Sequence, residues 1–231
     1  MELSDAIRRR RMVRTYTDAP VADHDLRACL EAATRAPSAG FSQGWDFVVL
    51  RSADARAGFW SATAEVDLPV ASGEPADASL RAAPDPDTEP ARAPDRWLRG
   101  VMTAPVLVVV CADRDRYLDR YAEPDKGWSD RDEARWPVPY WDVDAGMAAL
   151  LVLLTAVDRG LGGLFFGVPA HAHERVHALL GLRPGHRLVG VVALGHPAEH
   201  DRRSPSLRRG RRGLDGPDGV AHEGRLGLPL A

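Results

Sequence analysis

Three arginines near the N-terminus are spaced so that they could hold a phosphate. Arg10 and Arg11 are separated from Arg14 by two apolar residues. A guanidinium presents planar pairs of N–H donors that match the oxygens of a phosphate monoester. We expect a helix capped by Ser4 to run through Arg11, and in a helix Arg10 and Arg14 would share one face. The alternative is a solvated basic surface with no ligand.

A small polar loop follows at residues 37–40, with the sequence Pro-Ser-Ala-Gly. It ends a helix that Asp23 is expected to cap, and it leads into an apolar strand at 46–50. Such a sequence can be a simple turn. Its place between an arginine segment and a buried strand also suits a loop whose backbone groups border a flat ring.

A glycine-dense segment at 160–167 follows the best helical pattern of the chain, at 142–159. That helix is apolar nearly all round, so we expect it at the centre of the fold or at a subunit interface. Glycines after it allow the backbone to approach a flat ligand closely. The alternative is a helix end that enters a core strand.

The remaining pattern consists of helices with single strands between them. This order predicts an α+β or α/β layer fold in a single domain over 1–231. Residues 69–94 look like an irregular excursion, 113–136 like a loop or lid, and 202–231 like an arginine-rich tail. Further strands are expected at 105–111, 164–167 and 188–194, and further helices at 55–65, 96–102 and 173–180.

Composition and charge exclude several classes of partner. The chain has 231 residues, a formal net charge of −3 and 45% hydrophobic residues, with a pI near 6.2 and a mean hydropathy of −0.27. These values favour neither nucleic acid nor an anionic membrane as a partner. Apolar runs fall short of the roughly 20 residues that span a bilayer. The N-terminus lacks the apolar stretch of a signal peptide, so we expect a cytoplasmic protein.

Cysteines and histidines give little sign of a metal site. Cys29 and Cys111 lie in apolar patterns without metal-binding spacing, so we expect buried free thiols. His171, His173 and His177 lack a convincing further ligand and are interpreted as surface residues, so no metal is expected.

Four motifs in order, at 10–16, 36–45, 160–169 and 208–215, resemble the nitroreductase family of FMN flavoproteins. The sequence Arg-Arg-Met-Val-Arg-Thr-Tyr at 10–16 resembles that family's R-R-S-x-R-x-F/Y. The sequence Ala-Pro-Ser-Ala-Gly-Phe-Ser-Gln-Gly-Trp at 36–45 resembles its A-P-S-x-x-N-x-Q-P-W. The resemblance extends over 5–50, 97–112 and 140–195, and more loosely over 202–216. Met12 replaces a usual serine, Phe41 a frequent asparagine and Gly44 a proline.

The resemblance implies a set of FMN contacts. The N-terminal arginines and two arginines of the tail would hold the phosphate, and the Pro-Ser loop of a neighbouring subunit would border the ring. A backbone N–H at the end of the 164–167 strand would approach flavin N5, and one further arginine would lie near the pyrimidine edge. The implied residues are Arg10, Arg11, Met12, Arg14, Pro37, Ser38, Ala39, Gln43, Arg96, Phe166, Gly167, Arg209 and Arg211.

The resemblance also implies a fold and an activity. The fold is a nitroreductase-like α+β sandwich, a central and mostly antiparallel sheet of four or five strands flanked by helices, in an intertwined homodimer. The activity is transfer of hydride from NAD(P)H through flavin N5 to an electron-poor small molecule such as a nitroaromatic, quinone, enone or flavin, with no catalytic side chain required. The alternatives are a specialised member of the fold (related to the deazaflavin F420, flavin-fragmenting, a dehalogenase or an azoline oxidase) or a non-catalytic flavin-binding protein.

Overall fold

The computed structural model describes residues 1–64, 98–214, 219–226 and 228. They belong to two compact units, Met1–Asp201 and Arg202–Ala231. The excursion expected at 69–94 and the predicted FMN contact Arg96 lie outside the described residues.

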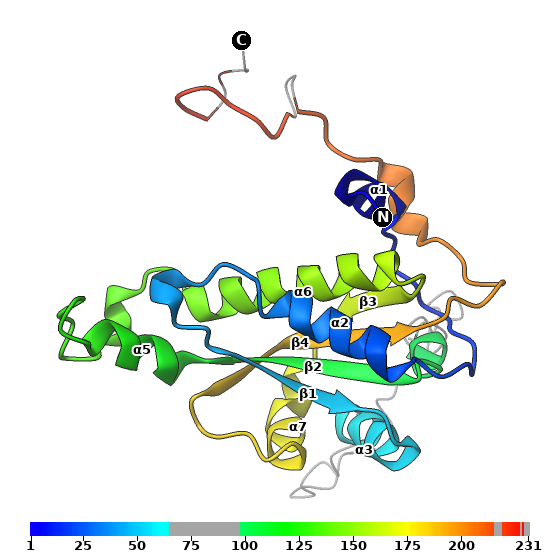
Figure 1. The fold of residues 1–231 in the computed structure, drawn as a ribbon, viewed down its shortest axis with the longest axis horizontal. Coiled ribbons are helices and arrows are strands. Elements are labelled where there is room, and N and C mark those ends of the chain that lie inside the picture. The colour runs from blue at the N-terminus through cyan, green and yellow to red at the C-terminus, as the bar shows by residue number, and fades with distance from the viewer. Residues whose placement is uncertain (65–97, 215–218, 227, 229–231) are drawn as a thin grey trace, which may run out of the picture. The chain divides into compact units, whose positions relative to one another are not determined.

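The described part of the first unit contains an antiparallel sheet of four strands (Figure 1). The strands β1 (Trp45–Leu50), β2 (Val106–Asp113), β3 (Gly162–Phe166) and β4 (His186–Gly195) lie in the order β1-β2-β4-β3. The central strand β2 is buried along its whole length, as expected for an apolar run covered on both faces. The predicted α+β fold and all four strands are confirmed.

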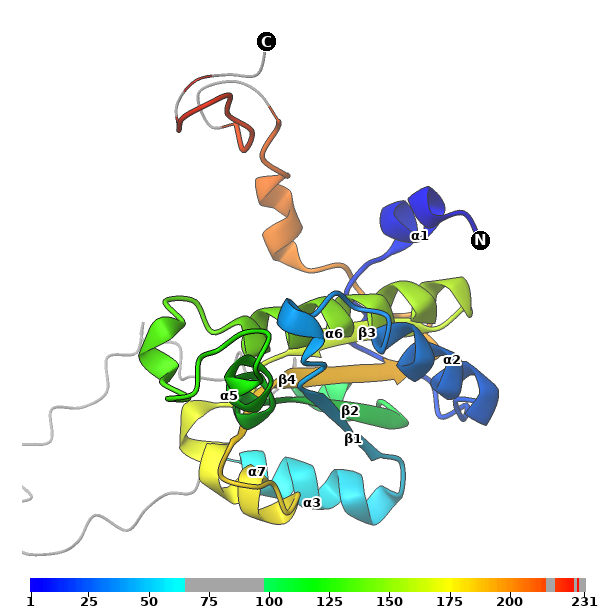
Figure 2. The same ribbon diagram turned by 60° about the vertical axis from the view of Figure 1, so that its left-hand side comes forward.

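Helices cover both faces of this sheet (Figure 2). The helices α2 (Asp23–Ala33) and α6 (Tyr140–Asp158) lie on one face, and α3 (Ala53–Thr63) and α7 (His173–Leu179) lie on the other. Alternate side chains of β2 point to opposite faces: Val108 and Val110 join the core with α2 and α6, whereas Leu107 and Val109 join the core with α3 and α7.

The N-terminal helix is shorter than the sequence suggests. The helix α1 spans Leu3–Arg9, begins after Glu2 and has no side-chain cap, so the cap predicted at Ser4 is wrong. Likewise α2 begins after Ala22, and Asp23 lies in its first turn instead of capping it. Residues 10–14 are not helical, so the prediction that Arg10 and Arg14 share a helical face is also wrong. Tertiary pairing explains the difference, because the backbone N–H of Val13 donates to Gly163 O at the edge strand β3, at 3.0 Å.

The segment expected as a loop or lid at 113–136 contains a helix, α5 (Arg114–Ala122). The side chain of Asp113 caps it by accepting the backbone N–H of Asp115 at 3.1 Å. Its buried residues are Tyr117 and Leu118. Charged neighbours of these two residues hide the amphipathic pattern in the sequence.

The helix α6 is long and apolar enough to cross a membrane by length and composition alone, and among the described helices it alone meets that test. The buried core helix of a soluble protein meets the same test. Here α6 packs on the sheet and on α2, with Ala145, Ala148, Val152 and Ala156 fully buried.

The second unit, Arg202–Ala231, holds the arginine-rich tail. A 3₁₀ helix spans Pro205–Arg209, and the side chain of Ser204 caps it. Beyond this helix, Arg212 donates to the backbone oxygen of Gly219 at 2.8 Å.

The reactivity of the two cysteine thiols tests whether they are buried in the core. Cys29 and Cys111 are free and buried, as predicted. Burial raises the pKa of each thiol to about 12, and Asp25 and Asp46 respectively add to the effect. We expect neither thiol to react with a disulfide reagent at pH 8 while the protein is folded, and both to react after denaturation, since the thiolate is the reactive form.

The same shift predicts a pH dependence of stability. An unfolded thiol titrates near a pKa of about 8.5. Because folding raises the pKa, the thiols leave stability unchanged below that pH and reduce it as pH rises toward about 12. Unfolding curves of the wild type and a Cys29→Ala, Cys111→Ala variant between pH 8 and 11 measure this. An equally steep decline in the variant, or rapid native labelling, would exclude the explanation.

Candidate functional site

The arginine segment lies beside the start of β3. Met12 forms a parallel bridge with Gly163. A Cβ atom on Gly162 would lie 2.6 Å from the side chain of Val13. One role of the glycine-dense turn is therefore to let residues of the same chain approach closely.

The buried carboxylate of Asp201 holds the backbone of the arginine segment. Its side chain is fully buried and accepts the backbone N–H groups of Arg14, at 2.8 Å, and Thr15, at 3.0 Å. It also forms an ion pair with Arg11. Arg11 is therefore engaged inside the chain, and the Asp201 carboxylate determines the course of the backbone that carries the arginines.

The other two arginines keep donors available. Arg14 donates one N–H to the backbone oxygen of Met12 at 3.0 Å. The other N–H groups of its guanidinium stay available for a ligand. Arg10 follows α1, and its backbone N–H donates to Ala6 O at 2.9 Å. Its side chain has no hydrogen bond or ion pair in the parts of the chain described. These two guanidiniums are therefore the ones that can take a phosphate.

The Pro-Ser loop is a tightly bonded turn. The backbone N–H of Gln43 donates to Ser38 Oγ at 2.8 Å, and the hydroxyl of Ser42 donates to Ala39 O at 2.7 Å. Arg120, on α5, donates to Gly40 O at 2.9 Å. The loop is therefore held both by its own side chains and by a neighbouring helix.

Asp144 anchors the same loop to α6. Its side chain is buried, and one oxygen accepts the backbone N–H of Ala39 and the hydroxyl of Tyr117, each at 2.8 Å. Burial raises the pKa of Tyr117, and the hydrogen bond to Asp144 acts in the same direction. The phenol therefore stays protonated and donates.

Replacing Asp144 with alanine is expected to reduce the free energy of unfolding by about 2–3 kcal/mol, because two buried donors lose their acceptor. Asp144→Asn keeps a carbonyl oxygen and should cost about 1 kcal/mol. Urea unfolding of the three proteins measures both values. If the loop borders a flavin, FMN affinity should fall more in the alanine variant. Equal stability of wild type and Asp144→Ala would contradict the assignment.

The end of β3 leaves its backbone accessible. The ring of Phe166 stacks on Trp60, with centroids 5.8 Å apart and planes at 15°. Gly167 follows as an exposed residue, and a Cβ atom there would meet nothing within 4 Å. A flat molecule therefore has room to approach the chain at Gly167.

Aromatic side chains of 128–141 support the loop. Trp136 packs against Tyr121, with centroids 4.6 Å apart, and against Trp128, at 5.6 Å. Tyr121 in turn occupies the position that a Cβ atom of Gly40 would need, 2.6 Å away. These residues form a packed cluster behind the Pro-Ser loop.

The predicted contacts do not all meet in one copy of the chain. The arginine segment lies along β3, whereas the Pro-Ser loop precedes β1, and these are the two edge strands. Three strand spacings of about 4.8 Å separate the edges. Along α6, the loop is anchored at Asp144, and Gly163 lies against Leu153. Arg209 and Arg211 belong to the second unit and stay predictions, as does Arg96.

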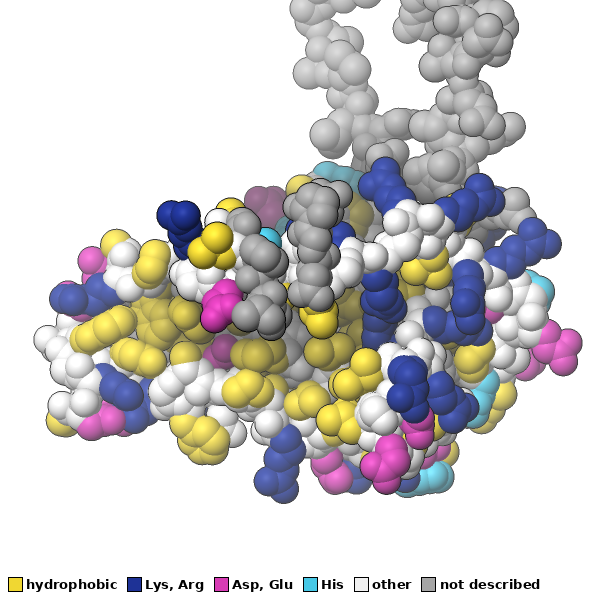
Figure 3. All heavy atoms as spheres, turned by 90° about the horizontal axis from the view of Figure 1, so that it is seen from above, with side chains coloured by type: hydrophobic (Ala, Val, Ile, Leu, Met, Phe, Trp, Pro, Cys, Tyr) yellow, Lys and Arg dark blue, Asp and Glu magenta, His cyan; other side chains and the backbone are white. Residues whose placement is uncertain are grey.

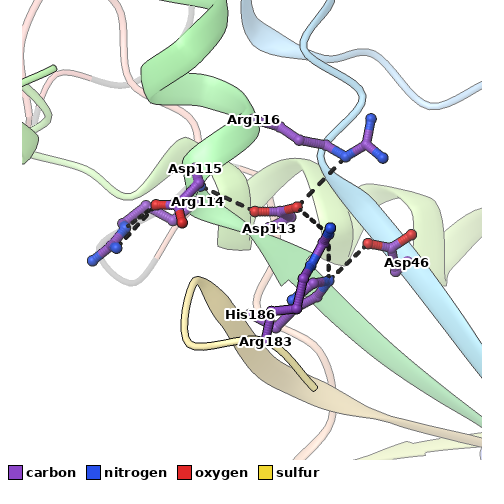
Figure 4. Close-up of polar contacts among 7 residues, drawn as sticks. All are labelled: Asp46, Asp113, Arg114, Asp115, Arg116, Arg183 and His186. Atoms are coloured by element: carbon purple, nitrogen blue, oxygen red, sulfur yellow. Dashed lines mark hydrogen bonds and ion pairs between the residues drawn. The ribbon is translucent and has the colours of Figure 1, made fainter. Parts of the chain in front are cut away.

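A charge network that the sequence did not reveal joins three strands (Figure 4). His186 Nε2 on β4 lies 3.0 Å from Asp46 on β1, and Arg183 lies 2.8 Å from Asp113 on β2 and 3.4 Å from His186. Arg116 approaches Asp113 at 3.6 Å. Ligand atoms of the two aspartates and His186 lie within 4.8 Å of one another. Asp113 already faces the guanidiniums of Arg183 and Arg116, and Asp46 faces His186. The arrangement is that of an ion-pair network between strands.

A hollow of about 640 Å³ opens beside this network, between α7 and the start of β4. Its lining includes His173, His177 and Arg187. None of the predicted FMN contacts belongs to that lining, so the hollow is separate from the arginine segment and the Pro-Ser loop.

The antiparallel four-stranded sheet between helical layers, with an arginine segment along one edge strand, is the arrangement of the nitroreductase fold. The nitroreductase family model matches residues 7–196. The chain therefore belongs to the nitroreductase family.

Known proteins of similar sequence and structure agree with this. A protein of Archaeoglobus fulgidus, provisionally named NADH dehydrogenase/NAD(P)H nitroreductase, is 28% identical over 193 residues, 82% of each chain. A Thermus thermophilus protein named NADH dehydrogenase is 29% identical over 219 residues, 86% of this chain and 88% of its own. A provisionally named nitroreductase of Desulfovibrio desulfuricans, solved in complex with FMN, is 25% identical, with 93% of each chain covered and a TM-score of 0.59.

Proposed function

We propose that the protein is an FMN-dependent oxidoreductase that passes hydride from NAD(P)H through the flavin to an electron-poor acceptor. The observation that carries the proposal is the arginine segment, in which Asp201 fixes the backbone while Arg10 and Arg14 keep donors for a phosphate. The FMN complex of the Desulfovibrio desulfuricans relative supports it, as do the names of the two NADH-linked relatives.

The site is best completed by a second copy of the chain. The arginine segment and the Pro-Ser loop lie at opposite edges of one sheet, so one flavin would take the arginines of one copy and the loop of another. Apolar side chains of α6, including Val143 and Leu150, are exposed, and Figure 3 looks onto the α6 side of the molecule and shows hydrophobic side chains gathered there. A homodimer that packs through α6 would bury them.

In such a site each group has a defined task. Bound FMN supplies the hydride-carrying ring, and the protein binds and orients it. Arg10 and Arg14 would hold the phosphate, with Arg209 and Arg211 as further candidates. The loop at 37–39 would border the ring, and the open backbone at Gly167 would give the ring access to an N–H. No side chain is required as an acid, since water can supply the proton of the acceptor.

Purified protein loaded with FMN tests the proposal in the absence of oxygen. We expect NADH or NADPH to bleach the visible flavin band, and an added quinone or nitroaromatic to restore it. Protein that binds FMN but is bleached by neither donor would exclude NAD(P)H oxidoreductase activity. Protein that binds no FMN would exclude the flavin site.

A further inference from the structure

Phe41 has an unusual combination of backbone and environment. Its φ is +57°, in the left-handed region that residues with a Cβ atom rarely occupy. The residue is 76% exposed, so burial of the phenyl ring does not compensate for this conformation. The chain retains a bulky apolar residue at a position where glycine would be the relaxed choice.

The surrounding turn imposes this conformation. The backbone N–H of Phe41 donates to Ser38 O at 2.9 Å, and that of Ser42 donates to Ala39 O at 3.1 Å. The preceding residue is already glycine, with φ +60°, and Tyr121 fills the space beside it. Glycine therefore stands at position 40, where the Tyr121 ring leaves no room for a Cβ atom. Phenylalanine follows at position 41, where hydrogen bonds of the turn fix the backbone. Strain of this kind is concentrated at functional sites.

We propose that the Phe41 ring is a specificity-determining contact for planar, apolar acceptors at the flavin site of the neighbouring copy. The proposal rests on the proposed function, in which residues 37–39 border that flavin. A phenyl ring favours stacked or edge-on contact with aromatic molecules. The acceptor class it selects is therefore the aromatic one, quinones and nitroaromatics, over small polar oxidants.

Replacement of Phe41 by glycine, asparagine or tyrosine in the full FMN-loaded protein tests this. Menadione serves as the planar apolar acceptor and ferricyanide as the small polar one. Phe41→Gly and Phe41→Asn should raise KM for menadione about tenfold, the loss expected for one aromatic contact with its apolar area, and leave kcat/KM for ferricyanide within about twofold. Phe41→Tyr should keep the wild-type KM for menadione, because it retains the aromatic ring. Thermal unfolding should occur at the same or a higher temperature in the glycine variant, since strain is relieved.

Several outcomes would overturn the proposal. The first is an equal loss of kcat/KM with both acceptors, and the second is a lower unfolding temperature of Phe41→Gly. The third is a shift of that variant to monomers in size-exclusion chromatography, which would make the ring a subunit contact. Bleaching of wild-type FMN by NAD(P)H reports on the proposed function alone, and the ratio between acceptors across the variants reports on Phe41. A wild type that turns over neither acceptor overturns both.

Discussion

Replacing Asp201 with alanine is expected to lower the free energy of unfolding by about 2–4 kcal/mol, because two backbone donors lose a buried acceptor and the partly exposed Arg11 loses its partner. The Asp201 side chain is fully buried and pairs with Arg11. It also accepts the backbone N–H groups of Arg14 and Thr15. The alanine variant leaves these donors without an acceptor, so the arginine segment should detach locally as well. Urea unfolding and hydrogen exchange at residues 11–15 measure the two effects.

A matched control separates this effect from the loss of any surface charge. Asp119 pairs with Arg131 at 2.9 Å, and both side chains are about half exposed. Asp119→Ala should cost no more than about 1 kcal/mol. If Asp201→Ala is as mild as Asp119→Ala, Asp201 does not anchor the segment.

Removing Arg10 and Arg14 together is expected to weaken FMN binding at least about 100-fold. A hydrogen bond to a charged group contributes about 1.5–3 kcal/mol, and each 1.4 kcal/mol is a factor of ten in affinity. Riboflavin lacks the phosphate, so its affinity should change by less than about threefold. Titrations of flavin fluorescence with the Arg10→Ala, Arg14→Ala variant and wild type measure both ligands.

Arg9 provides the control for this pair. It lies at the end of α1, next to the segment, and is exposed. Arg9→Ala should leave FMN affinity nearly unchanged, because it changes the local charge without a phosphate contact. A double variant that loses FMN and riboflavin equally would show that the two arginines support the fold rather than bind phosphate.

The sequence predicts the strands and the central helix well because their buried residues form local apolar patterns. The strand β2 is an uninterrupted apolar run, and α6 keeps apolar residues at helical spacing. The error at residues 10–14 has a tertiary cause, since pairing with the edge strand β3 at Gly163 draws the chain out of the helix. A local pattern holds no information about such a partner.

The anchors of the candidate site were missed for the same reason. Asp144 meets Ala39 across 105 positions of sequence, and Asp201 meets Arg11 across 190. Asp144 does leave one sequence signal, a carboxylate on the buried face of an otherwise apolar helix, which must have donors nearby. Asp201 leaves none, because it follows the last strand in a polar segment. The motifs indicate the ligand class, whereas these two carboxylates determine where the motifs lie.

We propose that one flavin site is assembled from two copies of the chain, and a mixed dimer of two variants tests this proposal. One copy carries Arg10→Ala and Arg14→Ala, the other carries Asp144→Ala to release its Pro-Ser loop, and distinct tags allow the mixed dimer to be isolated. Each variant alone should bind FMN weakly. A shared site predicts one FMN per mixed dimer at wild-type affinity, since the intact arginines of one copy meet the intact loop of the other. A mixed dimer that binds as weakly as both parents would contradict the claim.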